Sequence, residues 1–378
     1  MADLGPFPRR NLMAMLDEAH RATGPVHVAA RETGTAQTVT LPPLKVGRHV
    51  LPWVALHEHP PDAHWEETSF RSVVPWICEF SDVLVHGDAG IVCAGGEVVE
   101  DTLGQTSEML HHYTNGPTGV TLHGDGPVVE VEGNCLSLLN FNYDNYFHWT
   151  LDTLGRLAAA DSAALEACDT VLVPAFTTSF QRDGFARAGL ARSHRLQVVP
   201  KNATLRVQRM LVPWSIICDH RPHPCIVAYF NDLADGTAAA TLPRRVYVDR
   251  RGSRHRRMVN EEELVLALAQ LGFQPVALES LSLAEQIALF AQAEIIVSPH
   301  GAGLANIVYA RPGCRVIEIH IDFWVNWCYR RLAAVFGVTY DCVVGRQTPG
   351  LQQEWVNART WAVSVTHVMA AVESALTE

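Results

Sequence analysis

Three runs with apolar centres decide the fold of this 378-residue chain: RRVYVDR (244–250), EIIVSPH (294–300) and CRVIEIH (314–320). Strands of this kind, separated by segments of helical period, are typical of a parallel sheet covered on both faces. The intervening helices are predicted over 261–271 and 282–293, and a further strand over 274–278. Residues 239–345 are therefore predicted to form a Rossmann-like domain.

Local signals indicate where these helices begin and end. Asn260 and Glu263 have the spacing of a capping box, in which each side chain bonds the backbone N–H of the other. Ser282 and Glu285 repeat that spacing. Gly272 follows the first helix and is typical of a helix stop.

The sequence before this domain has a second α/β pattern. Its elements are predicted as strands at Asp169–Pro174, Leu196–Pro200 and Leu205–Pro213, with helices at Asn145–Ala160 and Ser179–Gly189. We predict an α/β domain over 131–238, with a linker near Tyr229 to Pro243. Residues 1–130 are expected to be a β-rich segment packed on that domain, and 346–378 a closing helical segment between Glu354 and Leu376.

Composition limits the function. The chain is 48% hydrophobic and 18% charged, which indicates globular domains, and its net charge of −11 argues against nucleic-acid binding. No apolar run approaches the ~20 residues that span a bilayer, and the N-terminus lacks a signal-peptide pattern. Nine scattered cysteines favour reduced thiols. We therefore expect a cytoplasmic protein with at most peripheral membrane association.

An arginine-rich loop follows the strand at 244–250. The segment DRRGSRHRR (249–257) holds five arginines: Arg250, Arg251, Arg254, Arg256 and Arg257. Ligands of open α/β sheets bind at the carboxyl ends of strands, and guanidinium groups match phosphate oxygens. The loop is therefore a candidate anion site; the alternative is a solvated basic loop.

A second candidate is SPHGAGL (298–304), where a buried strand meets a short helix expected from about Ala302. Gly301 and Gly303 leave room for a ligand against the backbone, N–H groups at the helix start favour an anion, and His300 could bond an oxygen. The third glycine of the dinucleotide fingerprint is missing, which disfavours a nicotinamide dehydrogenase.

Two further features could take part in chemistry. Glu318, near the end of a strand, could accept bonds from ribose hydroxyls; alternatively it forms a salt bridge or a helix cap. His148 and Asp152 lie four residues apart, so on a helix they share one face and could form a general base. The alternative for that pair is a structural contact.

Other patterns are weaker. His57, His59 and His64 have metal-like spacing, but two prolines interrupt it. No Asp-x-Asp motif is present, which disfavours a carboxylate clamp for a divalent ion on a nucleotide. Trp324 and Trp327 could line a sugar pocket, or could belong to the core.

Three motifs in order resemble one enzyme family: NYFHWTLDTLGRL, YVDRRGSRHRRMVNEEEL and SPHGAGLANIVYARPGCRVIEIH. Over roughly 90–345 the chain resembles glycosyltransferase family 61, the DUF563 group of capsular polysaccharide biosynthesis proteins. The resemblance implies a GT-B architecture of two facing Rossmann-like domains. It also implies an inverting, metal-independent transfer of sugar from a nucleoside diphosphate, usually UDP, to a glycan or polysaccharide, without a cofactor.

The resemblance also implies roles for residues that match the family's motifs. Asn145, His148 and Asp152 match the first motif, on the acceptor side; Asp152 is expected to be the base, with His148 orienting it or acting as the base itself. The donor-binding positions would be Arg250, Arg256, Asn260, His300, Gly301, Ala302, Gly303, Asn306 and Glu318. Asp249 departs from the family pattern, which often has serine there.

Three other functions remain open from the residues alone. A nucleotide- or sugar-binding protein without catalysis would share the fold and bind UDP without turnover. A Rossmann-type oxidoreductase would bind a nicotinamide cofactor. A metal-dependent hydrolase would use the N-terminal histidines.

Overall fold

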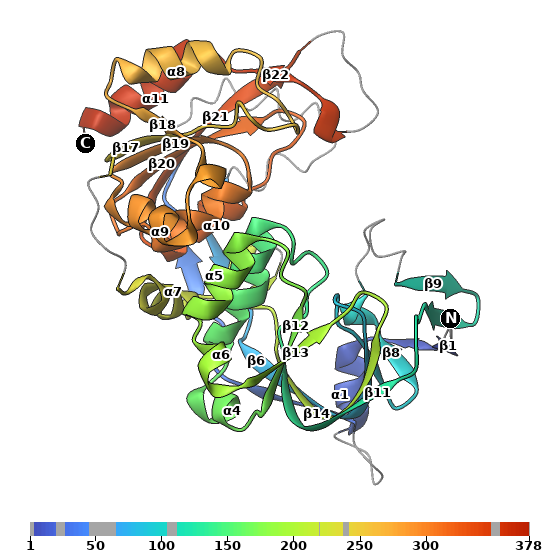
Figure 1. Ribbon diagram of the computed structural model, residues 1–378. Helices are drawn as coiled ribbons and strands as arrows, with labels where there is room; N and C mark the ends of the chain where they lie inside the picture. The colour runs from blue at the N-terminus through green and yellow to red at the C-terminus, as the bar shows by residue number, and fades with distance from the viewer. Residues whose placement is uncertain are drawn as a thin grey trace. The chain divides into compact units, whose positions relative to one another are not determined.

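The computed structural model of the protein describes residues 4–19, 27–44, 66–103, 112–218, 220–236, 242–348 and 356–377. The chain divides into two compact units (Figure 1): unit 1 holds Met1–Ala36 and Val74–Ile216, and unit 2 holds Gln37–Val73 and Ile217–Glu378. The predicted mixed α/β class is confirmed. Among the described residues, no helix is both long and apolar enough to cross a bilayer.

Unit 1 is built on a nine-stranded mixed sheet. Its strands are β2 (Arg9–Arg10), β3 (Val28–Glu32), β6 (Trp76–His86), β7 (Ile91–Ala94), β8 (Glu97–Val99), β11 (Val129–Ser137), β12 (Thr170–Pro174), β13 (Arg195–Val199) and β14 (Thr204–Pro213). The order is β13-β12-β11-β14-β6-β7-β8-β2, and β3 also pairs with β6. The four strands from β13 to β14 are parallel, whereas β6 runs antiparallel to β14.

The long strand β6 joins the two halves of this sheet. One edge pairs with β14 along its length, and the other pairs first with β3 and then with β7. Much of the β-rich N-terminal segment therefore continues the α/β sheet instead of packing on it as a separate layer. The core beside β6 includes Phe80, Val83 and Val207, with Leu12 of helix α1 (Leu12–Ala19) packed against them.

The remaining elements of unit 1 are short. They are the three-stranded sheet of β1 (Leu4–Phe7), β10 (Gly119–Leu122) and β9 (Tyr113–Gly116), the helices α4 (Ser162–Glu166), α5 (Ser179–Arg187) and α6 (Leu190–Ser193), and the 3-10 turn η2 (Glu100–Thr102). The helix expected over Asn145–Ala160 is irregular: a π-helical segment, η4 (His148–Leu154), leads into a 3-10 helix, η5 (Gly155–Ala159).

Unit 2 contains the predicted parallel sheet. Its strands are β17 (Arg245–Val248), β18 (Gln274–Val276), β19 (Ile295–Pro299), β20 (Arg315–Ile321), β21 (Thr339–Gln347) and β22 (Trp361–Ala362), in the order β18-β17-β19-β20-β21-β22. The first five strands of that order are parallel, and β22 adds an antiparallel edge. In chain order the parallel strands run 2-1-3-4-5, as in doubly wound folds.

Helices cover both faces of this sheet (Figure 1). One face carries α8 (Glu261–Ala269) and α11 (Val365–Thr377), which contact each other; the other carries α9 (Leu283–Gln292) and α10 (Cys328–Val335), both contacting the 3-10 helix η7 (Ala302–Tyr309). The remaining helical turns are η6 (Leu278–Ser280), η8 (Val356–Ala358) and α7 (Ile226–Ala234). Helix α7 occupies the first half of the stretch expected as a linker, and α11 is the α-helix found in the C-terminal stretch expected to be helical.

The two predicted capping boxes differ. Ser282 and Glu285 form the box at the start of α9, with Glu285 N donating to Ser282 Oγ and Ser282 N donating to Glu285 Oε2. Asn260 does not cap α8 with its side chain. Its amide instead exchanges two hydrogen bonds with the backbone of Val363, because β22 leads the chain back alongside it.

An N-terminal excursion contributes to unit 2. Strands β4 (Thr38–Thr40) and β5 (Ser69–Arg71) pair with each other, and their apolar side chains pack on Ala334 and Val335 at the end of α10. Glu67 accepts hydrogen bonds from both arginines of α10: its carboxylate from Arg331, and its carbonyl from Arg330. Two short paired strands, β15 (Ile217–Cys218) and β16 (Arg221–Pro222), complete the unit.

Candidate active site

The topology of unit 2 singles out one end of its sheet. Helix α8, after β17, and helix α9, after β18, lie on opposite faces, so the strand order reverses between β17 and β19 (Figure 1). Ligands of such sheets bind in the crevice at the carboxyl ends of the strands beside this reversal. Arg250 follows β17, and His300 follows β19. Two segments that are 50 residues apart in the sequence therefore meet where a ligand is expected.

Arg250 lies against the backbone after β19. Its Nη1 donates to the carbonyl oxygen of His300, and its Nη2 donates to Ser253 Oγ at 3.2 Å. A Cβ on Gly301 would come within 2.8 Å of Arg250 Nη1, so the glycine makes room for the guanidinium. Tyr329 OH donates to the carbonyl of Gly301 at 2.7 Å and fixes the other side of this peptide.

Arg256 brings a second guanidinium to the same region. Its φ is 48°, and its backbone is held by hydrogen bonds to Asn357 and from Trp361 Nε1, both at 2.7 Å. Its guanidinium carbon lies 4.9 Å from the centre of the Trp324 ring, in a cation–π contact. Burial, and next the charge of Arg250, lowers the pKa of Arg256 to about 10.

These two arginines lack carboxylate partners at ion-pair distance among the described residues, and Arg256 Nε has no hydrogen-bond partner there. Burial also lowers the pKa of Arg250. Arg251 is different: it pairs with Asp249 at 2.7 Å and with Glu262 at 2.5 Å. Asp249, which stands where the family often has serine, is therefore ion-paired with Arg251. Two concentrated positive charges are left to attract an anion.

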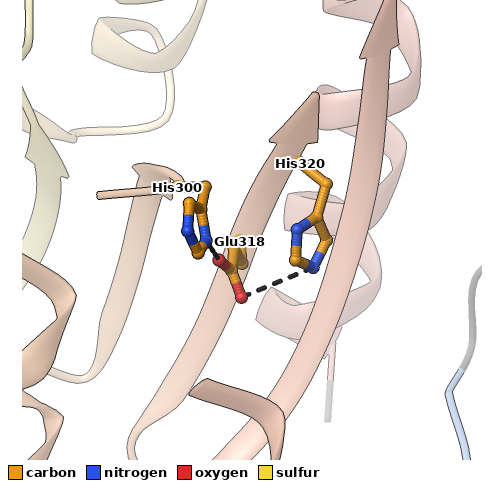
Figure 2. A group of neighbouring side chains, drawn as sticks. All are labelled: His300, Glu318 and His320. Atoms are coloured by element: carbon orange, nitrogen blue, oxygen red, sulfur yellow. Dashed lines mark hydrogen bonds and ion pairs between the residues drawn. The ribbon is translucent and has the colours of Figure 1, made fainter. Parts of the chain in front are cut away.

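His300 belongs to a buried cluster of polar groups with Glu318 and His320 of β20 (Figure 2). Tyr340 of β21 extends this cluster. His300 Nδ1 lies 2.5 Å from Glu318 Oε1, and Tyr340 OH donates to Glu318 Oε2 at 2.6 Å. His320 Nε2 lies 3.0 Å from Tyr340 OH and 3.5 Å from Glu318 Oε2. Burial, with the charges of Arg256 and Arg250, lowers the pKa of His300 to about 3, and burial raises the pKa of Glu318.

His300, Glu318 and His320 could together hold a metal ion, since their ligand atoms lie within 4.8 Å of one another (Figure 2). Two ligands of one tetrahedral zinc, with bonds of about 2.0–2.1 Å, would be roughly 3.3 Å apart. The 2.5 Å contact of His300 with Glu318 is a hydrogen-bond distance, so these groups would have to separate to hold a metal. The arrangement fits a hydrogen-bond relay better.

Several predicted donor-binding residues have structural contacts instead. Glu318 is fully buried and bonded at both oxygens, to His300 and to Tyr340, so in this structure it positions His300; its contact with ribose stays a prediction. Asn306 is also fully buried; its amide donates to Gln286 Oε1 and to the carbonyl of Gly303, joining α9 to η7. The amide of Asn260 is likewise engaged with the backbone, as described above.

The two small residues at the start of η7 remain compatible with a ligand. Ala302 and Gly303 are partly exposed and lie in the first turn of η7, where backbone N–H groups have no acceptor within the helix. A Cβ on Gly303 would lie 2.7 Å from Leu278 Cδ1. The glycine therefore also permits close packing beneath the turn.

The residues predicted for the acceptor side all belong to unit 1. His148 Nδ1 is 2.6 Å from Asp152 Oδ2, so the predicted pair forms although the segment is π-helical. Asn145, exposed just before η4, accepts a hydrogen bond from Phe147 N through its side chain and one from Trp149 N through its carbonyl. Asn145 thereby sets the start of the segment that carries the pair.

Sequence reasoning did not assign Tyr340, His320 or Arg156 to a site. His320 follows Glu318 by two residues on a strand, so alternation alone could have placed both on one face. Tyr340 depends on the pairing of β20 with β21, which no local pattern indicates. Of the weaker candidates, His57, His59 and His64 lie outside the described residues.

Comparison with known proteins matches this region to a family. Residues 146–317 match the family model described as Glycosyltransferase 61. Over 100 residues the chain is 36% identical to protein O-linked-mannose beta-1,4-N-acetylglucosaminyltransferase 2 of Tetraodon nigroviridis, covering 25% of this chain and 17% of that protein. Over 100 residues it is 31% identical to EGF domain-specific O-linked N-acetylglucosamine transferase of Drosophila melanogaster, covering 26% and 19%.

The matched family model and both relatives are glycosyltransferases. The match over 146–317 to the model of glycosyltransferase family 61 confirms, for that region, the resemblance drawn from the three motifs. The matched stretches span less than a fifth of the length of the two relatives.

Proposed function

We propose that this chain transfers a sugar from a nucleoside diphosphate, in the first instance UDP, to a hydroxyl of a glycan or polysaccharide, with inversion and without a metal ion. One observation carries the proposal: Arg250 and Arg256 lie beside the strand-order reversal of unit 2 without carboxylate partners among the described residues. A diphosphate supplies the negative charge that these partly buried cations lack.

The same charges account for the chemistry proposed at the leaving group. When the bond between sugar and diphosphate breaks, negative charge builds on the phosphate oxygens, and fixed guanidinium groups stabilise it. Arg250, Arg256 and the N–H groups at the start of η7 would do so here. A divalent cation at this position would be repelled by both arginines, which supports the metal-independent form of the reaction.

Proton removal from the acceptor is assigned to unit 1. The His148–Asp152 pair is a hydrogen-bonded imidazole and carboxylate, the arrangement that general bases commonly use. We include in the proposal a GT-B-like architecture, since each unit contains a sheet with four or more parallel strands. Both relatives are named as transferases of N-acetylglucosamine, so UDP-N-acetylglucosamine is the first donor to test.

Calorimetric titration with UDP, GDP, CDP, ADP, NAD and NADP, each with EDTA and with Mg²⁺, tests the proposal. We expect UDP to bind equally well in both. Arg250→Ala and Arg256→Ala should each weaken UDP binding by about 10-fold or more, the loss of one charge-assisted hydrogen bond.

Arg251→Ala is the matched control, because Arg251 lies in the same loop but is paired with Asp249 and Glu262, so UDP affinity should be unchanged. Binding of NAD or NADP alone would overturn the proposal, as would UDP binding that EDTA abolishes. Binding of UDP without turnover of any UDP-sugar would favour the alternative, a nucleotide- or sugar-binding protein without catalytic activity.

A further inference from the structure

A third charged residue lies behind the His148–Asp152 pair. His148, Asp152 and Arg156 follow one another at four-residue intervals along η4 and η5, and burial increases in that order. The side chain of His148 is 31% exposed and that of Asp152 is 23% exposed, whereas Arg156 is only 9% exposed. The three residues therefore lead from solvent into the interior of unit 1.

The contact between His148 and Asp152 distinguishes the two ring nitrogens. Nδ1 is the atom beside the carboxylate, at 2.6 Å from Asp152 Oδ2. An imidazole that donates its Nδ1–H to a carboxylate carries its lone pair on Nε2, at the far side of the ring. Because the ring is partly exposed, Nε2 is the nitrogen suited to take a proton from a substrate. Asp152 Oδ2 is already used by the imidazole.

Arg156 brings a positive charge close enough to interact electrostatically with this carboxylate. Its Nη2 donates to the carbonyl of Leu139 at 3.0 Å, and its Nε has no partner among the described residues. Burial lowers the pKa of Arg156 to about 10, and the charge of Asp152 opposes that effect. Helix α5, which contacts η4, adds Arg182, Asp183 and Arg187. The buried guanidinium of Arg156, one four-residue step further along the chain, therefore supplies a positive charge on the inner side of Asp152.

We propose that His148 Nε2 is the base of the transfer reaction, that Asp152 orients the imidazole, and that Arg156 is a positioning residue that balances the carboxylate. This inference rests on the proposed function. In the step, the acceptor hydroxyl gives its proton to Nε2 while its oxygen forms a bond to the anomeric carbon. The bond from that carbon to the diphosphate oxygen breaks, its electron pair leaves with the diphosphate, and the imidazolium later releases its proton to water.

Chemical rescue separates the two bases that the pair offers. With UDP release from UDP-N-acetylglucosamine as the assay, His148→Ala should lose about 10²- to 10⁴-fold in kcat, and added imidazole should restore part of it. Formate should not restore Asp152→Ala, since a carboxylate alone is not the base. Rescue of Asp152→Ala by formate, with none of His148→Ala by imidazole, would overturn the assignment.

Arg156 has its own pair of variants. Arg156→Met should lower kcat about 10-fold or more with little change in KM for the donor, and Arg156→Lys, which keeps the charge, should stay within about 3-fold of wild type. Arg182→Met, on the adjacent helix α5, is the control for loss of a nearby charge and should be neutral. A folded Arg156→Met variant with wild-type kcat would contradict the role given to Arg156.

A measurement that does not depend on turnover distinguishes failure of the base assignment from failure of the proposed function. Proton–nitrogen correlation spectra of the imidazole rings, with the His148 signals assigned from His148→Ala, report which nitrogen carries the proton. At pH 7.5 we expect the proton on Nδ1, and loss of that preference in Asp152→Asn. A proton on Nε2 in the wild type would refute the inference whatever the kinetics. Failure to turn over any UDP-sugar, with the proton on Nδ1, would instead refute the proposed function.

Discussion

Replacing Gly301 by alanine should weaken donor binding without unfolding the protein. The φ of Gly301 is 176°, an extended conformation that alanine adopts freely, so the backbone is not strained by the change. The new Cβ would lie 2.8 Å from Arg250 Nη1, which is too close. The end of a flexible side chain can move, and we expect Arg250 to swing away from the carbonyl of His300 while the fold persists.

The displaced guanidinium sets the size of the effect. A hydrogen bond to a charged group contributes about 1.5–3 kcal/mol, so UDP should bind roughly 10- to 100-fold more weakly to Gly301→Ala by calorimetry. Gly252→Ala is the matched control: its Cβ would meet Glu279 Oε1 at 3.5 Å, an ordinary contact, two residues from Arg250. Wild-type UDP affinity in a folded Gly301→Ala variant would refute the placement of the diphosphate against Arg250.

Three further predictions concern stability and the second arginine. Burial lowers the pKa of His86 to about 4, so as the pH falls the unfolded chain binds a proton at this histidine before the folded protein does. The free energy of unfolding, measured with urea, should therefore fall by about 3 kcal/mol from pH 6.5 to pH 4. This loss should be smaller in His86→Asn. Glu318→Gln presents an NH₂ group to His300 or to Tyr340, and should lower the free energy of urea unfolding by about 1–3 kcal/mol. An unchanged urea midpoint would contradict the hydrogen bonds assigned to Glu318. Trp361→Phe removes the hydrogen bond to the Arg256 carbonyl and should weaken UDP binding several-fold by calorimetry, with a loss of about 1 kcal/mol in stability.

The layers of unit 2 could be predicted from local pattern. The runs that became β17 and β19 are apolar at their centres, and β20 is apolar apart from Arg315, Glu318 and His320. Helices of about ten residues lie between these strands, which is the pattern of a covered parallel sheet. The strand order could not be predicted in the same way, because β17 pairs on both edges with strands that follow it in sequence. The long strand β6 was missed for a related reason, since its pairing with β14 joins residues more than 100 positions apart.

The candidate site, too, could be predicted from the sequence only in part. The meeting of Arg250 with His300 and Gly301 followed from the rule for strand ends, and the contact of His148 with Asp152 followed from helical spacing. A contact with ribose was predicted for Glu318 because its burial depends on neighbouring strands and is not visible in the local sequence. Polar residues such as Asn306 look alike in sequence whether they bind a substrate or a backbone carbonyl, and only packing separates the two.

The chain passes between the two units three times, after Ala36, Val73 and Ile216. A protein fragment starting at residue 217 would consequently lack the strands β4 and β5 that cover the end of α10. It would also lack Glu67, whose carboxylate pairs with the buried Arg331. Neither unit is a contiguous module, so the protein should resist dissection: unit 2 is expected to recover its fold only when the residue 37–73 segment is supplied with it.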